Sequence, residues 1–209
     1  MPLMNINLLS QRLYNYTVAF IILLLTFVVG TFFPNDHLKE ELRRKTINEI
    51  KSIGIFEPKI SNQSNLDFIN TTTKCINYLN LDLHKDQQIP TVLILSQAVV
   101  ESNYGQSRLA IEAQNLFGIR IWTKEGVLPH KVHPDSNWRI RVFKSKCQSV
   151  KFYINLLNTS HHYAEFRKIR QYNKDPIILA KTLDKFSTSQ DYTNEIIRNI
   201  KHLKLRYGK

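Results

Sequence analysis

An unbroken apolar run near the amino terminus is the most pronounced hydrophobic pattern in the sequence. No charged side chain occurs from Leu13 to Asn35, and Arg12 precedes the run. About 20 apolar residues are enough to cross a bilayer as a helix, and this run lacks the polar face that a soluble core helix would show. We therefore expect residues 1–35 to form a membrane anchor or a signal segment. Because no Ala-x-Ala cleavage pattern follows, an uncleaved transmembrane helix is the simpler interpretation.

Weaker helical patterns fill the region between this run and residue 88. Residues 36–53 carry apolar side chains among charges at roughly helical spacing, and residues 66–83 repeat the pattern after a break at Gly54 and Pro58. We expect residues 36–88 to form a helical stalk or a set of N-terminal helices.

The central pattern is a helix with almost no polar face. Pro90 suits its first turn, where the missing proline N–H is not needed, and apolar residues dominate from Val92 to Val100 before Gly105 ends the run. A helix that is apolar on nearly all sides is predicted to be buried. We expect it to open the main domain, residues 89–209.

The pattern changes after the central helix and then becomes helical again. Glycine and proline punctuate residues 119–143, and the alternation within residues 139–143 is typical of a strand. Further helices are expected at residues 150–158, 161–171, 177–186 and 191–205. Ser149 is the expected N-cap of the first of these, and Asp175-Pro176 opens the third. The predicted fold class is mainly α with a small β-hairpin lobe.

The charge of the chain narrows the choice of partner. Lys and Arg number 29 against 17 Asp and Glu, which gives a net charge of +12 and favours a partner that carries negative charge. The basic residues are dispersed, and neither a zinc-finger spacing nor an aromatic RNA-binding pattern accompanies them. We therefore expect no nucleic-acid binding.

Two cysteines, Cys75 and Cys147, match no metal-binding motif. We expect two buried thiols. The alternative is a disulfide, which requires an oxidising compartment and a fold that brings the two residues together.

Glu101 stands at the end of the central apolar run, and three interpretations of it compete. The first is an ordinary ion pair, but the C-terminal end of a helix disfavours an anion. The second is a metal ligand, but no histidine lies within a turn of Glu101, so no metal or other cofactor is expected. The third is the acid of a glycosidase, which protonates the departing glycosidic oxygen. Apolar neighbours raise the pKa of a carboxylate, as that role requires.

The residues that follow Glu101 carry a resemblance to a known family. Glu101 to Ala110 reads Glu-Ser-Asn-Tyr-Gly-Gln-Ser-Arg-Leu-Ala, and Asn-Leu-Phe-Gly-Ile follows at residues 115–119. This resembles the E-S-x-W/Y-G-x-S-x-x-A…N-L-F-G signature of bacterial peptidoglycan N-acetylglucosaminidases, glycoside hydrolase family 73, and within that group the Bax-type proteins. Residues 141–150, 156–159 and 186–196 resemble further segments of the same proteins.

The resemblance implies a lysozyme-like α+β domain with Glu101 as the catalytic acid. The implied reaction is hydrolysis of the β-1,4 bond after N-acetylglucosamine in the glycan strands of peptidoglycan. The implied substrate-binding residues are Tyr104, Asn115, Phe117 and Tyr192. No metal or cofactor is implied.

The resemblance also implies a location in the bacterial cell envelope. The domain would face the periplasm and the wall, with the N-terminal helix in the cytoplasmic membrane. The basic residues Lys39, Arg43, Arg44 and Lys45 follow the apolar run, and the positive-inside rule alone would keep that side in the cytoplasm. The position of the polymer outside the membrane overrides this weaker signal, and the anionic stem peptides and wall polymers suit the positive net charge.

Two departures from the family pattern bear on the chemistry. Phe186 stands where relatives carry tyrosine before the late serine, and the position beside Arg139, where family members are often assigned a second carboxylate, is basic. Glu125 and Asp135 are nearby substitutes for that second group. Assistance by the N-acetyl group of the substrate is a third possibility.

Two other functions stay open from the sequence. A muramidase or lytic transglycosylase of similar fold would also use one glutamate at a helix end. A non-catalytic wall-binding or scaffolding protein would hold glycan without cleaving it. The oligomeric state, the cleavage of the N-terminal segment and the cellular process served are open as well.

Overall fold

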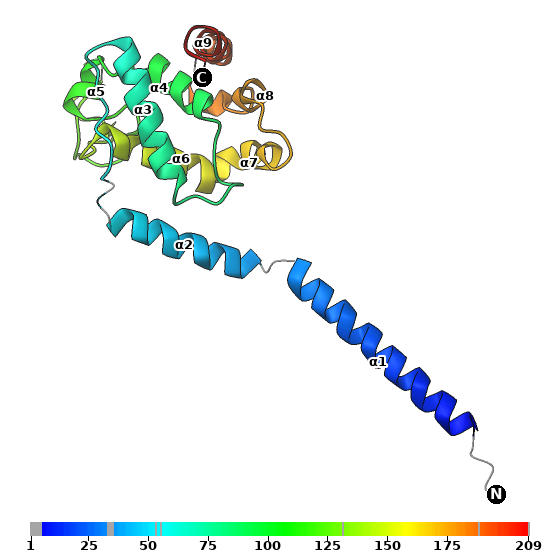
Figure 1. Ribbon diagram of the computed structural model, residues 1–209. Coiled ribbons are helices and arrows are strands. Elements are labelled where there is room, and N and C mark those ends of the chain that lie inside the picture. Colours follow the sequence, from blue (N-terminus) through cyan, green and yellow to red (C-terminus); the bar gives the residue numbers. More distant parts are fainter. Residues whose placement is uncertain are drawn as a thin grey trace, which may run out of the picture. The chain divides into compact units, whose positions relative to one another are not determined.

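A computed structural model describes residues 6–32, 36–52, 54, 56–130, 132–187 and 189–208 (Figure 1). The chain divides into two units, Met1–Ile55 and Phe56–Lys209. Each unit is described by itself below.

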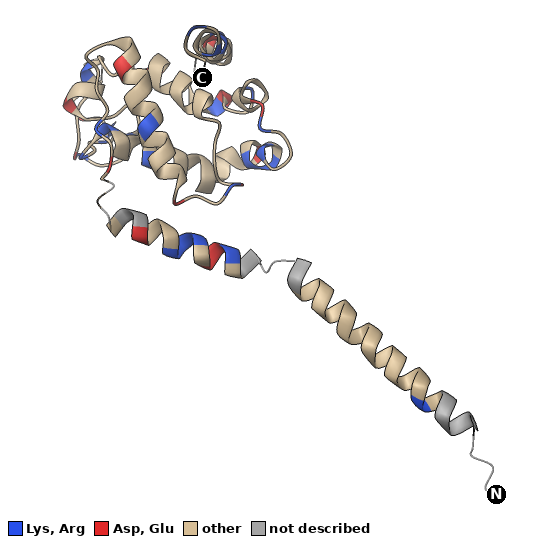
Figure 2. Ribbon diagram, viewed as in Figure 1, with Lys and Arg blue, Asp and Glu red and all other residues tan. Residues whose placement is uncertain are grey.

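The first unit contains two helices, α1 (Ile6–Phe32) and α2 (Asp36–Ser52). Within α1, the stretch Gln11–Gly30 is long and apolar enough to cross a membrane, and none of it is buried by the rest of the protein. Figure 2 shows that α1 is almost free of charged residues, whereas α2 carries charges of both signs. A secretion signal and a membrane anchor are both apolar helices near the amino terminus, so α1 suits either.

The second unit is mainly helical. Its helices are α3 (Asn65–Asn80), α4 (Thr91–Ser102), α5 (Arg108–Glu112), α6 (Lys146–Thr159), α7 (Ala164–Arg170), α8 (Pro176–Ala180) and α9 (Tyr192–Tyr207), with short 3-10 turns at His161–Tyr163 and Asp184–Phe186. Helix α4 packs against α3, α8 and α9, and Leu93, Ile94 and Leu95 are fully buried. The prediction of a central buried helix is therefore confirmed.

Short polar side chains fix where several of these helices begin. Asp175 accepts hydrogen bonds from the N–H groups of Ile177 and Ile178, so the predicted Asp-Pro start of α8 is confirmed. The predicted N-cap at Ser149 is wrong. Helix α6 begins earlier, because the Ser145 hydroxyl accepts from the N–H of Gln148 at 3.0 Å. The helix expected over residues 177–186 is also shorter, and α8 ends at Ala180.

A small antiparallel sheet follows α5. Strand β1 (Arg120–Ile121) pairs with β2 (Arg139–Ile140), with Arg120 opposite Ile140, and Val127 forms a further bridge to Ile140. Gly126 has φ +101°, and a Cβ there would lie 2.4 Å from the Ile140 carbonyl oxygen, so only glycine fits this crossing. The mainly α fold with a small β lobe is confirmed.

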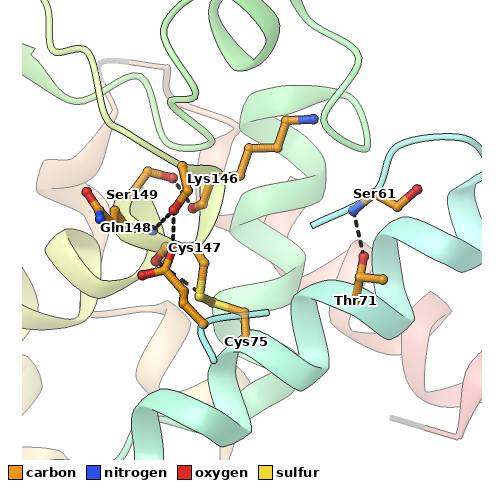
Figure 3. The surroundings of a disulfide bond; sticks show 9 residues. Ser61, Thr71, Cys75, Lys146, Cys147, Gln148 and Ser149 are labelled. Carbon is orange, nitrogen blue, oxygen red and sulfur yellow. Dashed lines mark hydrogen bonds between the residues drawn. A yellow bond between two sulfur atoms is a disulfide. The ribbon is translucent and has the colours of Figure 1, made fainter. Parts of the chain in front are cut away.

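A disulfide joins Cys75 of α3 to Cys147 in the first turn of α6 (Figure 3). The Cα atoms are 5.8 Å apart although the residues are 72 positions apart in sequence. The expectation of two thiols is therefore wrong. The spacing could not reveal the pair, because it is the packing of α3 on α6 that brings the cysteines together.

Helix α3, which carries Cys75 of the disulfide, is part of the second unit. The stalk or N-terminal helices expected over residues 36–88 stay a prediction, and α3, which lies in that range, belongs to the second unit, which begins at Phe56. Its residues Phe68, Ile69 and Ile76 are fully buried in the core of that unit. The catalytic domain expected over residues 89–209 stays a prediction, and α3 is now a candidate support for it.

Candidate active site

Glu101 lies in the last turn of α4 and is half-buried. The next three residues, Asn103, Tyr104 and Gly105, all have left-handed backbone angles, with φ of 49°, 54° and 74°. Such angles are uncommon outside glycine and cluster at functional sites. These angles turn the chain sharply just after α4 ends at Ser102, the residue after Glu101.

Two neighbours hold this turn in place. The Ser102 hydroxyl donates to the Ala98 carbonyl at 2.5 Å and accepts from the Gly105 N–H at 2.8 Å. A Cβ at Gly105 would lie 2.8 Å from the ring of Phe68, so the turn lies directly on the core. Ser102 and Gly105 therefore fix the shape of the turn at the end of α4.

Asn115 closes the loop that lies beside Glu101. Its Nδ2 donates to the carbonyls of Ile119 and Arg141 at 3.0 and 2.9 Å, and its Oδ1 accepts from the N–H groups of Phe117 and Ile119. The residue is 1% exposed, so the amide is engaged with backbone on both sides. Asn115 therefore lies on the buried side of the loop, where its amide bonds to the backbone.

Gly118 brings this loop to the carboxylate. It has φ +61°, and a Cβ at this position would lie 3.9 Å from Oε2 of Glu101. The space would admit a methyl group, so the left-handed angle is what favours glycine here. Gly118, the last residue of the Asn-Leu-Phe-Gly segment, therefore lies next to Glu101 in space.

The surroundings of Glu101 favour its protonated form. Burial raises the pKa of the carboxyl group, and the nearby carboxylate of Glu195 raises it further, while a hydrogen bond from Tyr192 opposes both. A carboxylic acid whose pKa is raised keeps its proton to higher pH, which is what a general acid requires.

A path of hydrogen bonds leads from Glu101 into the core. The Tyr192 hydroxyl lies close enough to Glu101 to favour its carboxylate form. The Gln97 Nε2 atom donates to the Tyr192 hydroxyl at 2.9 Å, and the Tyr153 hydroxyl donates to the Gln97 Oε1 atom. Burial and the carboxylate of Glu101 raise the pKa of Tyr192, so its hydroxyl is neutral at ordinary pH.

Aromatic rings surround this path. Phe117 stacks on Tyr153 with ring centroids 4.2 Å apart, Phe186 meets Tyr153 edge-on at 5.6 Å, and Phe186 stacks on Tyr192 at 5.9 Å. Phe117 is 2% exposed. Phe186 therefore supplies a ring to this cluster.

Tyr104 lies in the turn that follows α4. It is half-buried, and its ring meets Phe68 edge-on at 6.1 Å. Burial raises the pKa of its hydroxyl, the neighbouring Tyr207 adds to the rise, and Arg206 opposes it. The last turn of α9 therefore lies near Tyr104.

The two candidates for a second carboxylate are both exposed. Asp135 lies 3.4 Å from the imidazole of His133, and Glu125 is in the loop between the strands. Glu195 is the carboxylate that acts on Glu101. Among the described residues, no group of three or more His, Cys, Asp or Glu is placed to hold a metal ion.

Three residues of this site were not singled out from the sequence as functional. Gln97, Tyr153 and Glu195 lie on three different helices. Gln97 had a usable signal, because it is the single amide in the apolar run of α4 and precedes Glu101 by four residues, which puts both on one helix face. Glu195 lies within the segment 186–196 that carries the resemblance, but without a role assigned to it, and Tyr153 had no signal, because only the packing of α6 brings it here.

Comparison with known proteins gives a family match over most of the second unit. Residues 80–205 match the sequence profile described as mannosyl-glycoprotein endo-beta-N-acetylglucosaminidase. Protein bax from Escherichia coli (strain K12) is 36% identical over 92 residues, which are 44% of this chain and 32% of that protein. The chain thus matches about a third of the length of this relative.

Solved structures with a similar fold include two bacterial domains. The catalytic domain of the autolysin Auto from Listeria monocytogenes has a TM-score of 0.50 at 18% identity, covering 76% of this chain and 93% of that one. A C-terminally truncated glycoside hydrolase domain of FlgJ from Salmonella typhimurium has a TM-score of 0.49 at 21% identity, covering 68% and 99%. At this identity, the likeness to the autolysin domain shows a shared fold.

Proposed function

Since the chain belongs to the mannosyl-glycoprotein endo-beta-N-acetylglucosaminidase family and carries a glycoside hydrolase domain of that family, we propose that it hydrolyses peptidoglycan. The proposed bond is the β-1,4 linkage after N-acetylglucosamine, and the proposed general acid is Glu101. The observation that carries this proposal is the state of Glu101, which burial holds toward its protonated form at the end of α4.

In the proposed first step, Glu101 gives its proton to the glycosidic oxygen. The bond between that oxygen and the anomeric carbon of N-acetylglucosamine breaks, and Glu101 becomes a carboxylate. The Tyr192 hydroxyl then donates to a full negative charge, and such a hydrogen bond is stronger than one to a neutral acid. The partners of Glu101 thus suit the form that it takes as the bond breaks.

The positive charge left on the anomeric carbon needs a partner, and the proposed candidates are Glu125, Asp135 and the N-acetyl group of the substrate, whose oxygen would bond to that carbon as the leaving group departs. In the second step, water adds to the anomeric carbon, any bond from the assisting group to that carbon breaks, and the proton of the water passes to the Glu101 carboxylate. Both carboxylates are exposed in the structure, whereas an N-acetyl group would arrive with the sugar. We favour the N-acetyl group, because the carboxylate that raises the pKa of Glu101 is Glu195 of α9 and not Glu125 or Asp135 of the β lobe.

The proposed substrate-binding residues fall into two groups by the solvent exposure of their side chains. Tyr104 is half-buried in the turn that follows α4, and we propose it as the residue that meets a sugar ring. Asn115, Phe117 and Tyr192 are 1%, 2% and 4% exposed. For these three, we propose that they shape and support the site, with any contact to glycan limited to the edge that each exposes.

The proposed location is the bacterial cell envelope. A disulfide forms in an oxidising compartment, and α1 suits export as a signal or as an anchor. We propose the second of these, with α1 in the cytoplasmic membrane and residues 89–209 as the catalytic domain facing the wall. The proposed partners are therefore glycan strands and the membrane, with no nucleic acid.

Digestion of purified peptidoglycan by the full-length protein in detergent tests this function. The parent should release soluble fragments, and Glu101→Gln should release none while still sedimenting with the wall material. Binding by both proteins with no release by either would favour the scaffolding function and would overturn the proposal.

A further inference from the structure

A line of hydrogen-bonding side chains crosses the core behind Glu101. Tyr153 comes from α6, Gln97 from α4 and Tyr192 from α9. Tyr153 and Gln97 are fully buried, and Tyr192 is 4% exposed. Polar groups in such surroundings must satisfy one another, because water does not reach them.

The amide of Gln97 gives this line a direction. Its oxygen accepts the proton of the Tyr153 hydroxyl, so its nitrogen is the atom that faces Tyr192 and donates to it at 2.9 Å. A tyrosine hydroxyl has one proton. Because Gln97 donates to the Tyr192 oxygen, the proton of Tyr192 is left to be donated toward Glu101, whose carboxylate form Tyr192 favours.

We propose that Gln97 is a positioning residue, which fixes the Tyr192 hydroxyl as a hydrogen-bond donor to Glu101 and is itself fixed by Tyr153. The effect on catalysis rests on the proposed function, in which Glu101 is the general acid. The effect on the carboxyl group of Glu101 does not.

The direction of the bond matters most while the proton leaves Glu101. A donated hydrogen bond strengthens as negative charge develops on the carboxylate. An interaction that is stronger in the transition state than in the ground state raises kcat rather than lowering KM. Gln97→Met keeps similar length but removes the donor, and Tyr192 is then free to accept from the protonated acid. We expect kcat to fall about tenfold with KM unchanged, a loss of about 1.4 kcal/mol of transition-state stabilisation.

Other groups that face Glu101 are unchanged by this substitution. They are Glu195 and Tyr192 on α9 and Tyr153 on α6. A change in the ionisation of Glu101 in Gln97→Met therefore reports on the loss of the amide and on its effect on the Tyr192 hydroxyl.

A titration that needs no turnover tests the proposal. The full-length protein in detergent micelles, labelled with ¹³C at the glutamate side-chain carboxyl carbon, gives a signal for Glu101 that is assigned by its loss in Glu101→Gln. We expect the pKa of Glu101 to be higher in Gln97→Met than in the parent. The double variant Gln97→Met/Tyr192→Phe should match Tyr192→Phe alone, because Gln97 acts through Tyr192.

Ser96→Ala is the matched control on the same helix. Ser96 is fully buried, and its hydroxyl donates to the Val92 carbonyl at 2.7 Å without touching the line. The pKa of Glu101 should be unchanged in this variant. Tyr153→Phe keeps the ring stacked on Phe117 and should give a smaller rise than Gln97→Met, which covers the case in which Gln97→Met does not fold.

Three results would overturn the proposal. One is an unchanged pKa of Glu101 in Gln97→Met. Another is a lowered pKa, which would mean that Tyr192 donates to Gln97 in the parent and is released toward Glu101 by the substitution. The third is a further rise in the double variant, which would mean that Gln97 acts independently of Tyr192. A protein that fails to digest peptidoglycan still gives these titrations, so the two failures are distinguishable.

Discussion

Tyr192, in the first turn of α9, acts on Glu101, in the last turn of α4, and favours its carboxylate form. The two residues lie far apart in sequence, and the packing of α9 on α4 brings them together. Burial favours the protonated acid, so the ionisation of Glu101 is set by two opposing effects.

Tyr192→Phe removes the effect that favours the carboxylate. The pKa of Glu101 should rise, and because a general acid is active only while protonated, the fall of kcat at high pH should move to higher pH. The rate at low pH should drop about tenfold, because the developing carboxylate loses a charge-assisted hydrogen bond. A pH profile of peptidoglycan hydrolysis measures both. A shift of the fall to lower pH would contradict this assignment of the donor.

Glu195→Gln should act in the opposite direction. The carboxylate of Glu195 raises the pKa of Glu101, so its neutralisation should lower that pKa and move the fall of activity to lower pH. Glu195 is exposed, so salt should screen the effect and bring the two profiles together at high ionic strength. Profiles of the parent and Glu195→Gln at low and high salt check this. A difference that persists unchanged at high salt would rule out the electrostatic cause.

Asn115→Ala should weaken the fold as well as the site. The substitution leaves four backbone groups of the loop without their side-chain partners, and unsatisfied buried groups cost about 1–3 kcal/mol each before the loop relaxes. We expect the free energy of unfolding to fall by roughly 3 kcal/mol in denaturant titrations. Gln114→Ala is the control and should change stability little, because the half-buried Gln114 side chain donates only to the Ile111 carbonyl within its own turn. Equal stability of the two variants would contradict the role given to Asn115.

Reduction of the Cys75–Cys147 disulfide should destabilise the second unit. The bond closes a loop of about 72 residues that contains α4 and Glu101, and chain entropy alone gives up to about 4 kcal/mol for a loop of that size. The melting temperature should therefore fall in dithiothreitol. The variant Cys75→Ala/Cys147→Ala should melt near the reduced parent and be insensitive to the reductant. If the parent melts at one temperature in both conditions, the disulfide does not stabilise the protein.

The sequence predicted the central helix and its glutamate because both are local features. An apolar run of the length of α4 has few alternatives to a buried helix, and Glu101 stands out at its end. The partners of Glu101 are not local. Tyr192, Tyr153 and Glu195 reach the site through the packing of α6 and α9, and no periodicity encodes which faces of two distant helices will meet.

The misplaced helix start and the missed disulfide have the same origin. Ser145 and Ser149 are equally good caps as residue types, and Ser149 instead accepts from the N–H of Leu116 inside the core. Cys75 lies in α3 and Cys147 in α6, and the sequence does not show that these two helices pack together. In both cases a tertiary contact decides between options that are locally equivalent.

The identity of the new sugar end tests the central claim most directly. Purified peptidoglycan is digested with the full-length protein and with Glu101→Gln, the fragments are reduced with borohydride, and their ends are determined by mass spectrometry. Reduced N-acetylglucosamine ends, formed by the parent and not by Glu101→Gln, are the predicted result. Muramic or anhydro-muramic ends would contradict the proposed bond and place the protein among the muramidases or lytic transglycosylases.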